Sequence, residues 1–221
     1  MDTSVRVAAS RSVPLALALF TAPWGLAAAN AAYAWATRAG GGDETGAQTL
    51  ALAAAHPGLY RLGSVAAMLG SLLMVPAALG AHRLLAGRSP RLGTTGAVLM
   101  AGGYVCYFAI AFTGVIELAM AERGGPVPDY AAVLDRGQDD LTGLWVFLLF
   151  VLGNLVGTLL LGAALLRSHR VPAWAAVAVL AWPPLHVAGL VAGSEWFEVA
   201  GGVLQAVGLG AAGIRLLNAT G

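Results

Sequence analysis

Six apolar stretches, each about long enough to cross a lipid bilayer, constrain the fold of this chain more than any other feature. They cover residues 13–37, 62–85, 92–120, 141–166, 171–192 and 196–217. A helix of about 20 apolar residues spans the hydrocarbon core, and helices satisfy their own backbone hydrogen bonds there. The sequence therefore predicts an all-α, polytopic bundle of six transmembrane helices that forms one transmembrane domain over residues 1–221.

The composition supports a membrane protein and excludes several other classes. Hydrophobic residues make up 58% of the chain and charged residues only 10%, with a mean hydropathy of +0.77. Ordinary soluble domains are far more charged. The net charge of +1, without a dense basic cluster, predicts no nucleic-acid partner. Cys106 is the only cysteine, which excludes intrachain disulfides and cysteine-based zinc or iron–sulfur sites.

The first apolar stretch has two interpretations. The sequence Ala29-Asn30-Ala31 fits the small-residue pattern at which a signal peptide is cleaved. The stretch is longer than a signal core requires, so a retained helix is the preferred interpretation. The lipid bilayer is then the main partner, and the predicted location is the bacterial cytoplasmic membrane as a multi-pass protein.

Charge predicts how the helices are oriented. The loops and chain ends on one side of the predicted bundle carry eight arginines, and the loops on the other side carry four. By the positive-inside rule, the richer set faces the cytoplasm, which places both termini there. The richer set comprises Arg6, Arg11, Arg83, Arg88, Arg91, Arg167, Arg170 and Arg215, and the poorer set Arg38, Arg61, Arg123 and Arg136.

The connections between the spans are predicted to be mostly irregular. Residues 37–59 are interpreted as a loop, and the glycine- and proline-rich segment 124–128 is expected not to be helical. A short surface helix is predicted over 129–136. Asp139 and Asp140 are expected to cap the fourth span.

Two adjacent prolines lie inside the fifth apolar stretch, at Trp182-Pro183-Pro184-Leu185-His186. Neither proline donates an amide hydrogen, and each ring crowds the preceding turn. The helix is therefore expected to kink or open, and such broken membrane helices often mark an internal site. His186 follows the break directly, with Trp182 one turn earlier on the same face.

Three ionisable residues are predicted to share one depth in the membrane. Counting about 1.5 Å per residue places Glu117, His186 and Glu198 in the outer third of the third, fifth and sixth spans. Ionisable groups within a membrane usually face the bundle interior, so these three are the candidate catalytic residues of an outward-opening pocket. The alternative is that both glutamates lie among the lipid headgroups. His186 would then form a hydrogen bond with backbone carbonyls that lose their helical partners at the two prolines. No metal-binding spacing such as His-x-x-Glu-His occurs, and no metal is expected.

Polar and aromatic side chains deeper in the bundle are candidate substrate-binding residues. These are Trp182, Tyr104, Phe108, Phe112 and Asn154, which could line an apolar pocket together with Tyr107. The alternative for the rings is helix packing. The alternative for Asn154 is a hydrogen bond between helices, beside a close-packing face formed by Gly153 and Gly157.

Several short motifs resemble a broad group of six-helix bacterial membrane proteins that has no settled activity. The similarity is carried by His56-Pro57-Gly58, by Leu69-Gly70-Ser71-Leu72, by Pro76 and its following Ala77-Ala78-Leu79-Gly80, and by basic turns that end at Pro90 and Pro172. The resemblance implies the six-helix topology and nothing about activity.

Two classes of function remain open, and whether the chain is an enzyme is undecided. No Walker loop, Rossmann fingerprint, Gly-x-Ser-x-Gly elbow or bis-histidine haem pattern is present, so no cofactor is expected. The first hypothesis is acid–base catalysis on a membrane-dissolved apolar substrate, most concretely isoprenoid cyclisation by a terpene cyclase. The second is a non-enzymatic small-molecule binder or carrier, or an accessory subunit whose glycine-rich faces bury a helix partner or a second copy of the chain.

Overall fold

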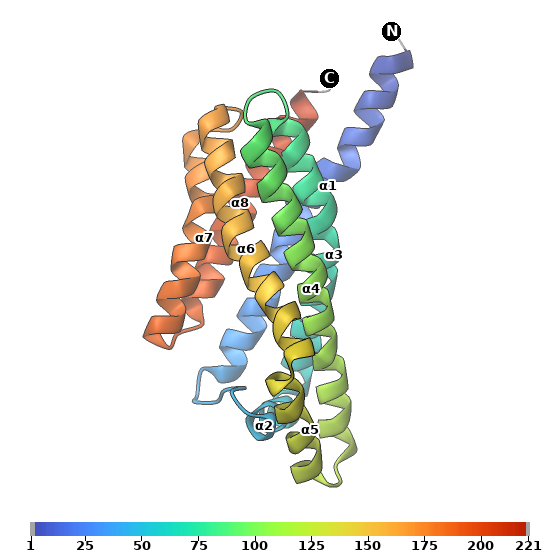
Figure 1. Cartoon of the computed structure of the whole chain (residues 1–221), viewed down its shortest axis with the longest axis vertical. Helices are drawn as coiled ribbons and strands as arrows, with labels where there is room; N and C mark the ends of the chain where they lie inside the picture. The colour runs from blue at the N-terminus through green and yellow to red at the C-terminus, as the bar shows by residue number, and fades with distance from the viewer. Residues whose placement is uncertain (1–2, 220–221) are drawn as a thin grey trace.

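The computed structural model describes the backbone of residues 3–219 and the side chains of residues 12–219, and the described part is entirely helical and irregular (Figure 1). This confirms the all-α prediction. The helices are α1 (Thr3–Thr37), α2 (Gly46–Ala55), α3 (Pro57–Leu85), α4 (Pro90–Arg123), α5 (Val127–Asp139), α6 (Leu141–Ser168), α7 (Ala173–Ala192) and α8 (Trp196–Asn218).

Six of these helices are long and apolar enough to cross a membrane, namely α1 from Ser12 onward, α3, α4, α6, α7 and α8. The protein is an integral, multi-pass membrane protein. Several helices extend beyond the predicted apolar stretches. Helices α3 and α4 begin at Pro57 and Pro90, because a proline in the first turn has its φ angle preset and lacks only an amide hydrogen that would be unpaired there anyway.

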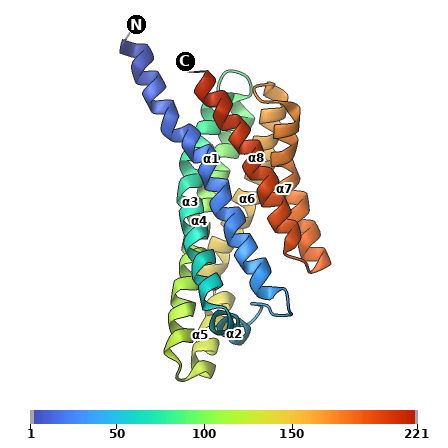
Figure 2. The ribbon, with the colours of Figure 1, turned by 180° about the vertical axis from the view of Figure 1, so that it is seen from behind.

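The six long helices pack in a closed ring. Helix α1 packs against α3 and α8, α4 packs against α3 and α6, and α7 packs against α6 and α8. Figures 1 and 2 show this arrangement from two sides, with both chain termini at the same end. We call this end the terminal face. The opposite end, which α2 and α5 cover, is called the capped face.

Helices α2 and α5 were not fully predicted. Helix α2 lies within the segment predicted as a loop, and its start is stabilised by a capping box between Thr45 and Gln48. Helix α5 includes Val127 and Pro128, so the prediction that these residues are not helical was wrong; a proline is tolerated in the first helical turn. The amide of Gly46 donates to Asp135 Oδ1 at 2.6 Å, which joins the two helices.

Helix α6 begins as predicted at an aspartate cap. Asp140 Oδ1 accepts a hydrogen bond of 2.7 Å from the amide of Thr142, whereas Asp139 is the last residue of α5. The cap satisfies one of the unpaired amides in the first turn of a helix that must then enter the membrane.

Helix α7 is continuous from Ala173 to Ala192, across both Pro183 and Pro184. The helix was expected to kink or open at the prolines; the opening was wrong, and the kink stays a prediction. Intact turns on both sides hold the two residues in helical geometry, as membrane helices commonly allow. Proline also lies inside α1 and α3 without ending them. The position of His186 therefore follows from the regular helical repeat rather than from a break.

Glycines bring α4 and α6 into backbone contact. A Cβ atom added to Gly157 would lie 2.7 Å from the backbone nitrogen of Met100, and one added to Gly96 would lie 2.7 Å from that of Leu161. At Gly103 the nearest atom would be the Cα of Gly153, at 2.9 Å. Real Cβ atoms do not approach so closely, so the predicted close-packing face at Gly153 and Gly157 is confirmed.

Candidate functional site

A large cavity lies inside the capped face of the bundle. Its volume is about 910 Å³, and its lining includes residues from α2 and α5 as well as from the long helices. Small-molecule sites usually have volumes of about 300–1,000 Å³, so this cavity could hold a complete ligand. Glu117, His186 and Glu198 all line it, from α4, α7 and α8 respectively.

The ionisable residues of the lining are mostly acidic. Four carboxylates line the cavity, those of Asp43, Glu117, Glu195 and Glu198. No arginine is among the described lining residues, and His186 is the one basic side chain there. Since like charges disfavour one another in a partly dry cavity, this lining is complementary to a positively charged group.

The best-defined part of the site is formed by α7 and α8. His186 Nδ1 is buried and contacts Glu198 Oε1, without a well-aligned hydrogen bond to any described residue. The two side chains are 23% and 18% exposed, so solvent screens this pair only partly. A protonated imidazole would form an ion pair with this carboxylate.

Trp182 supports the imidazole from one side. The rings of Trp182 and His186 are stacked at a centroid distance of 5.1 Å and an interplanar angle of 15°. The four-residue spacing places both on one face of α7. Gly201 leaves the room for the indole, because a Cβ there would lie 3.2 Å from Trp182 Cδ1. Trp182 is 6% exposed and lies behind His186, outside the cavity lining.

Two tyrosines hold two other carboxylates of the lining in place. Tyr60, at the start of α3, donates its hydroxyl to Glu117 Oε2 on α4. Tyr33, near the end of α1, donates to Asp43 Oδ1 at 2.8 Å. Both tyrosines line the cavity. These bonds fix the positions of two carboxylate groups at the cavity wall.

Aromatic rings from α4 and α6 form the apolar wall. Tyr107 stacks on Phe150 with ring centroids 4.5 Å apart, and Phe147 lies 6.4 Å from Phe150. All three rings line the cavity. Aromatic faces attract cations, so this wall and the carboxylates favour the same kind of ligand.

Glu195 lies in the turn between α7 and α8, outside the apolar spans. Burial raises the pKa of its carboxyl group above the ordinary value of 4.5, the negative charges of Glu198 and Asp43 raise it further, and His186 lowers it. Glu195 is thus the cavity carboxylate outside the spans that binds a proton more readily than a free glutamate.

The raised pKa of Glu195 predicts a pH-dependent effect of Glu195→Gln. Since the folded state favours the protonated acid, its contribution to stability is complete below about pH 4.5 and is lost as the pH rises through the folded pKa. Glutamine resembles the protonated acid at every pH. The melting temperature of Glu195→Gln minus that of the wild type should therefore increase between pH 4 and pH 8. Glu44→Gln, at an exposed acid outside the lining, is the control, and an equal increase there would contradict the assignment.

The structure places the other predicted binding residues outside the cavity lining. Tyr104 and Asn154 are buried and form a hydrogen bond with each other, in which Tyr104 Oη donates to Asn154 Oδ1 at 2.9 Å. Phe108 is half-buried, and Phe112 is 49% exposed on the outer surface of α4. The roles of these residues and of Trp182 in substrate binding stay predictions, as do the catalytic roles of Glu117, His186 and Glu198.

The Tyr104–Asn154 bond joins α4 to α6 and should contribute to stability. Replacing Asn154 with alanine leaves the phenol hydroxyl without this acceptor in a buried position, and we expect a loss of about 1–2 kcal/mol. Thermal unfolding in detergent measures the change. Thr113→Ala is the matched control, because Thr113 is exposed and donates to Ile110 in its own helix. Equal melting temperatures of the two variants would contradict a structural role for this bond.

Sequence reasoning missed part of the lining, notably Tyr33, Asp43, Tyr60, Phe150 and Glu195. Tyr60 could have been found by counting the rise per residue along each helix. It lies near the start of its span, at about the membrane depth at which Glu117 lies near the end of the next span. The side chains of α2, α5 and the loops gave no such signal, because their positions depend on tertiary packing.

No group of three histidine, cysteine, aspartate or glutamate side chains within the described residues is arranged to hold a metal ion. No protein-family model, curated protein or solved structure matches this chain.

Proposed function

We propose that this membrane protein binds a small molecule in the cavity of its capped face, as a non-enzymatic binder or carrier, and that the ligand carries a positively charged group. The observation that carries the proposal is the cavity of about 910 Å³ with four carboxylates, aromatic rings and no arginine among its described lining residues.

The carboxylates that line the cavity repel one another. Ionised carboxylates close to one another and partly removed from water are unfavourable, and His186 contacts only one of the four. A ligand cation would relieve this repulsion. The rings of Tyr107 and Phe150 could cover its apolar part and contribute a cation–π attraction of about 0.5–2 kcal/mol.

The direct test uses two water-soluble aromatic ions of similar size and opposite charge, benzyltrimethylammonium and benzylsulfonate. The purified protein in uncharged detergent is titrated with each, and its melting temperature is recorded. The ammonium ion should raise the melting temperature in a saturable manner, and the sulfonate should not. Equal effects of the two ions, or a stronger effect of the sulfonate, would overturn the proposal.

The arginine distribution supports an orientation with the capped face outside and both termini in the cytoplasm. Single cysteines at Glu44 and Asp129, in a background with Cys106→Ser, should then react with a membrane-impermeant maleimide added to intact cells. A cysteine at Arg88 should react only after the cells are opened. Labelling of the Arg88 position alone in intact cells would invert the proposed orientation.

A second candidate function is acid–base catalysis, and the contact between His186 and Glu198 specifically favours it. In isoprenoid cyclisation, Glu117 or Glu198 in its protonated form would donate a proton to an alkene or epoxide. The resulting cation would close a ring, and His186 would accept the proton that leaves, so that the product is an isomer of the substrate. Conversion of an unsaturated or epoxidised prenyl substrate to a cyclic isomer of equal mass, lost in Glu198→Gln, would favour catalysis over binding alone.

A further inference from the structure

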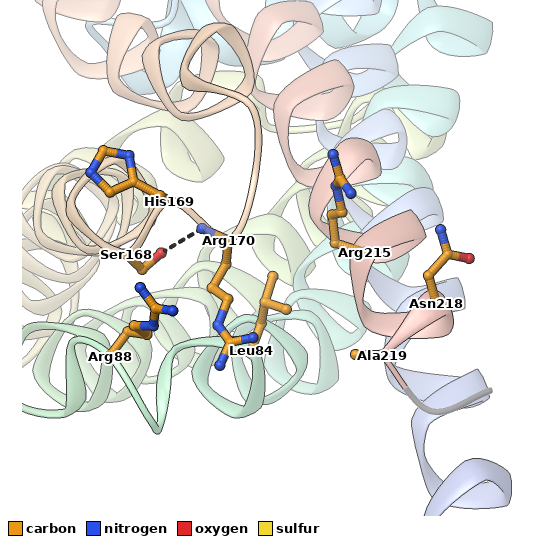
Figure 3. Close-up of a pocket in the computed structure, with 8 residues that line it drawn as sticks. All are labelled: Leu84, Arg88, Ser168, His169, Arg170, Arg215, Asn218 and Ala219. Carbon is orange, nitrogen blue, oxygen red and sulfur yellow. Dashed lines mark hydrogen bonds between the residues drawn. The ribbon is translucent and has the colours of Figure 1, made fainter.

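A second pocket lies at the terminal face, at the opposite end of the bundle from the acidic cavity. Its volume is about 330 Å³, and Figure 3 shows the side chains that line it. They come from the ends of α3, α6 and α8 and from two loops, and comprise Leu84, Arg88, Ser168, His169, Arg170, Arg215, Asn218 and Ala219.

Three arginines meet at this pocket from three parts of the chain. Arg88 lies in the loop between α3 and α4, Arg170 lies in the loop between α6 and α7, and Arg215 lies on α8. All three are exposed and so can reach a ligand from solvent or from the lipid surface. Arg170 reaches the neighbouring loop, since a Cβ added to Gly87 would lie 3.8 Å from its Nη2.

No acidic side chain is among the described residues that line this pocket. The sequence explains this, because no aspartate or glutamate occurs between residues 45 and 116, between residues 141 and 194, or after residue 198. Within the described lining, the arginines therefore repel one another with no carboxylate among them, and an anion would remove this repulsion.

The backbone at the pocket is held in a defined conformation. Ser168 Oγ donates to the carbonyl of Leu165 at 2.9 Å and accepts from the amide of Arg170 at 3.2 Å. Between them, His169 has a φ angle of 52°, which turns the chain sharply after α6. The turn thus places Arg170 beside the end of α6 instead of leaving it on a free loop.

The pocket also lies where the apolar spans end, which is the level expected for lipid phosphates. The apolar spans end nearby at Leu85, Ser168 and Asn218, and two begin nearby at Pro90 and Ala173. Neither α4 nor α7 has a side-chain hydrogen bond at its cap, so the positive ends of both helix dipoles remain at this face. Basic pockets between transmembrane helices at this depth suit anionic headgroups.

We propose that the pocket formed by Arg88, Arg170 and Arg215 is a phosphate-binding site. Arginine suits this group because its planar guanidinium can donate two parallel hydrogen bonds to phosphate oxygens. The phosphate could belong to an anionic phospholipid or to a free anion, and the two sources share the same chemistry. This site is independent of the acidic cavity and of its proposed ligand.

The test uses the full chain in uncharged detergent and three probes: dioctanoyl phosphatidylglycerol, dioctanoyl phosphatidylcholine and inorganic phosphate. Binding is measured by native mass spectrometry and by the rise in melting temperature. Each arginine near a membrane surface contributes about fivefold to anion affinity, so Arg88→Gln with Arg170→Gln should weaken binding roughly 25-fold. Arg123→Gln with Arg136→Gln, which removes the same charge at the capped face, should leave binding unchanged.

The outcomes distinguish the source of the phosphate. A preference for phosphatidylglycerol over phosphatidylcholine that depends on Arg88 and Arg170 identifies a lipid headgroup. Arginine-dependent binding of inorganic phosphate alone identifies a free anion. Binding of neither anion, or binding that survives loss of both arginines, overturns the proposal.

A second measurement keeps the test decisive if the glutamine variant does not fold. The wild type should lose most of its preference for the anion when salt is raised from 50 to 500 mM, because the contacts are electrostatic. Arg88→Lys with Arg170→Lys should retain the charge and most of the binding. An anion preference of the wild type that does not respond to salt would contradict the proposal.

Discussion

Replacing Gly157 with valine should lower the melting temperature and the yield of folded protein more than any other single substitution proposed above. Gly157 lies where α4 and α6 touch, and a Cβ added to it would be 2.7 Å from the backbone nitrogen of Met100. The obstacle is backbone, which cannot move aside as a side chain can, so the two helices must separate along their contact. We expect a loss of at least about 3 kcal/mol, at the upper end of overpacking effects, against a total stability of about 5–15 kcal/mol.

The yield of monodisperse protein and its melting temperature measure this effect. Gly102→Val is the matched control, because a Cβ added to Gly102, also on α4, would have no atom within 4 Å. The control should behave like the wild type. A Gly157→Val protein as stable as the control would mean that α4 and α6 do not pack as described.

Replacing carboxylates of the acidic cavity should strongly lower its affinity for a cationic ligand. Glu198→Gln removes one charge with almost no change of shape, and we expect the affinity for benzyltrimethylammonium to fall at least tenfold, which corresponds to about 1.4 kcal/mol. The double variant with Glu117→Gln should lose about 100-fold if the two carboxylates act independently. A change of this size is expected because hydrogen bonds and contacts to charged groups contribute about 1.5–3 kcal/mol.

Glu122→Gln is the control for this prediction. Glu122 is exposed, pairs with Arg61 at 2.6 Å and is absent from the cavity lining. Its replacement should leave the affinity for the ammonium ion unchanged. A similar loss in Glu122→Gln and Glu198→Gln would show that the ion responds to general surface charge and does not bind in the cavity.

The helical architecture could be predicted from the sequence, because apolar length alone limits the choices in a membrane. The positions of the helix ends could not be predicted from apolar length alone, because capping residues and prolines also determine where a helix begins. Pro57 and Pro90 begin helices ahead of the apolar stretches, and Thr45 with Gln48 begins a helix in a predicted loop. Pro183 and Pro184 showed the opposite error, since a local propensity to break a helix was overridden by its neighbours.

The candidate site could be predicted only in outline. Depth along the helices suggested that Glu117, His186 and Glu198 lie at one level, and the structure places them around one cavity. Depth does not specify rotation about the helix axis. Phe112 therefore lies on the outer surface and Trp182 lies behind His186, although both were candidates for the lining.

We propose that the cavity of the capped face binds a cationic ligand, and a structure of the protein in lipid nanodiscs with benzyltrimethylammonium would reveal where that ion lies. We expect density for the ammonium group between the carboxylates of Glu117 and Glu198, with its ring against Tyr107 and Phe150. A cavity that holds only a lipid chain at saturating ammonium, or His186 turned away from Glu198 toward the bilayer, would contradict it.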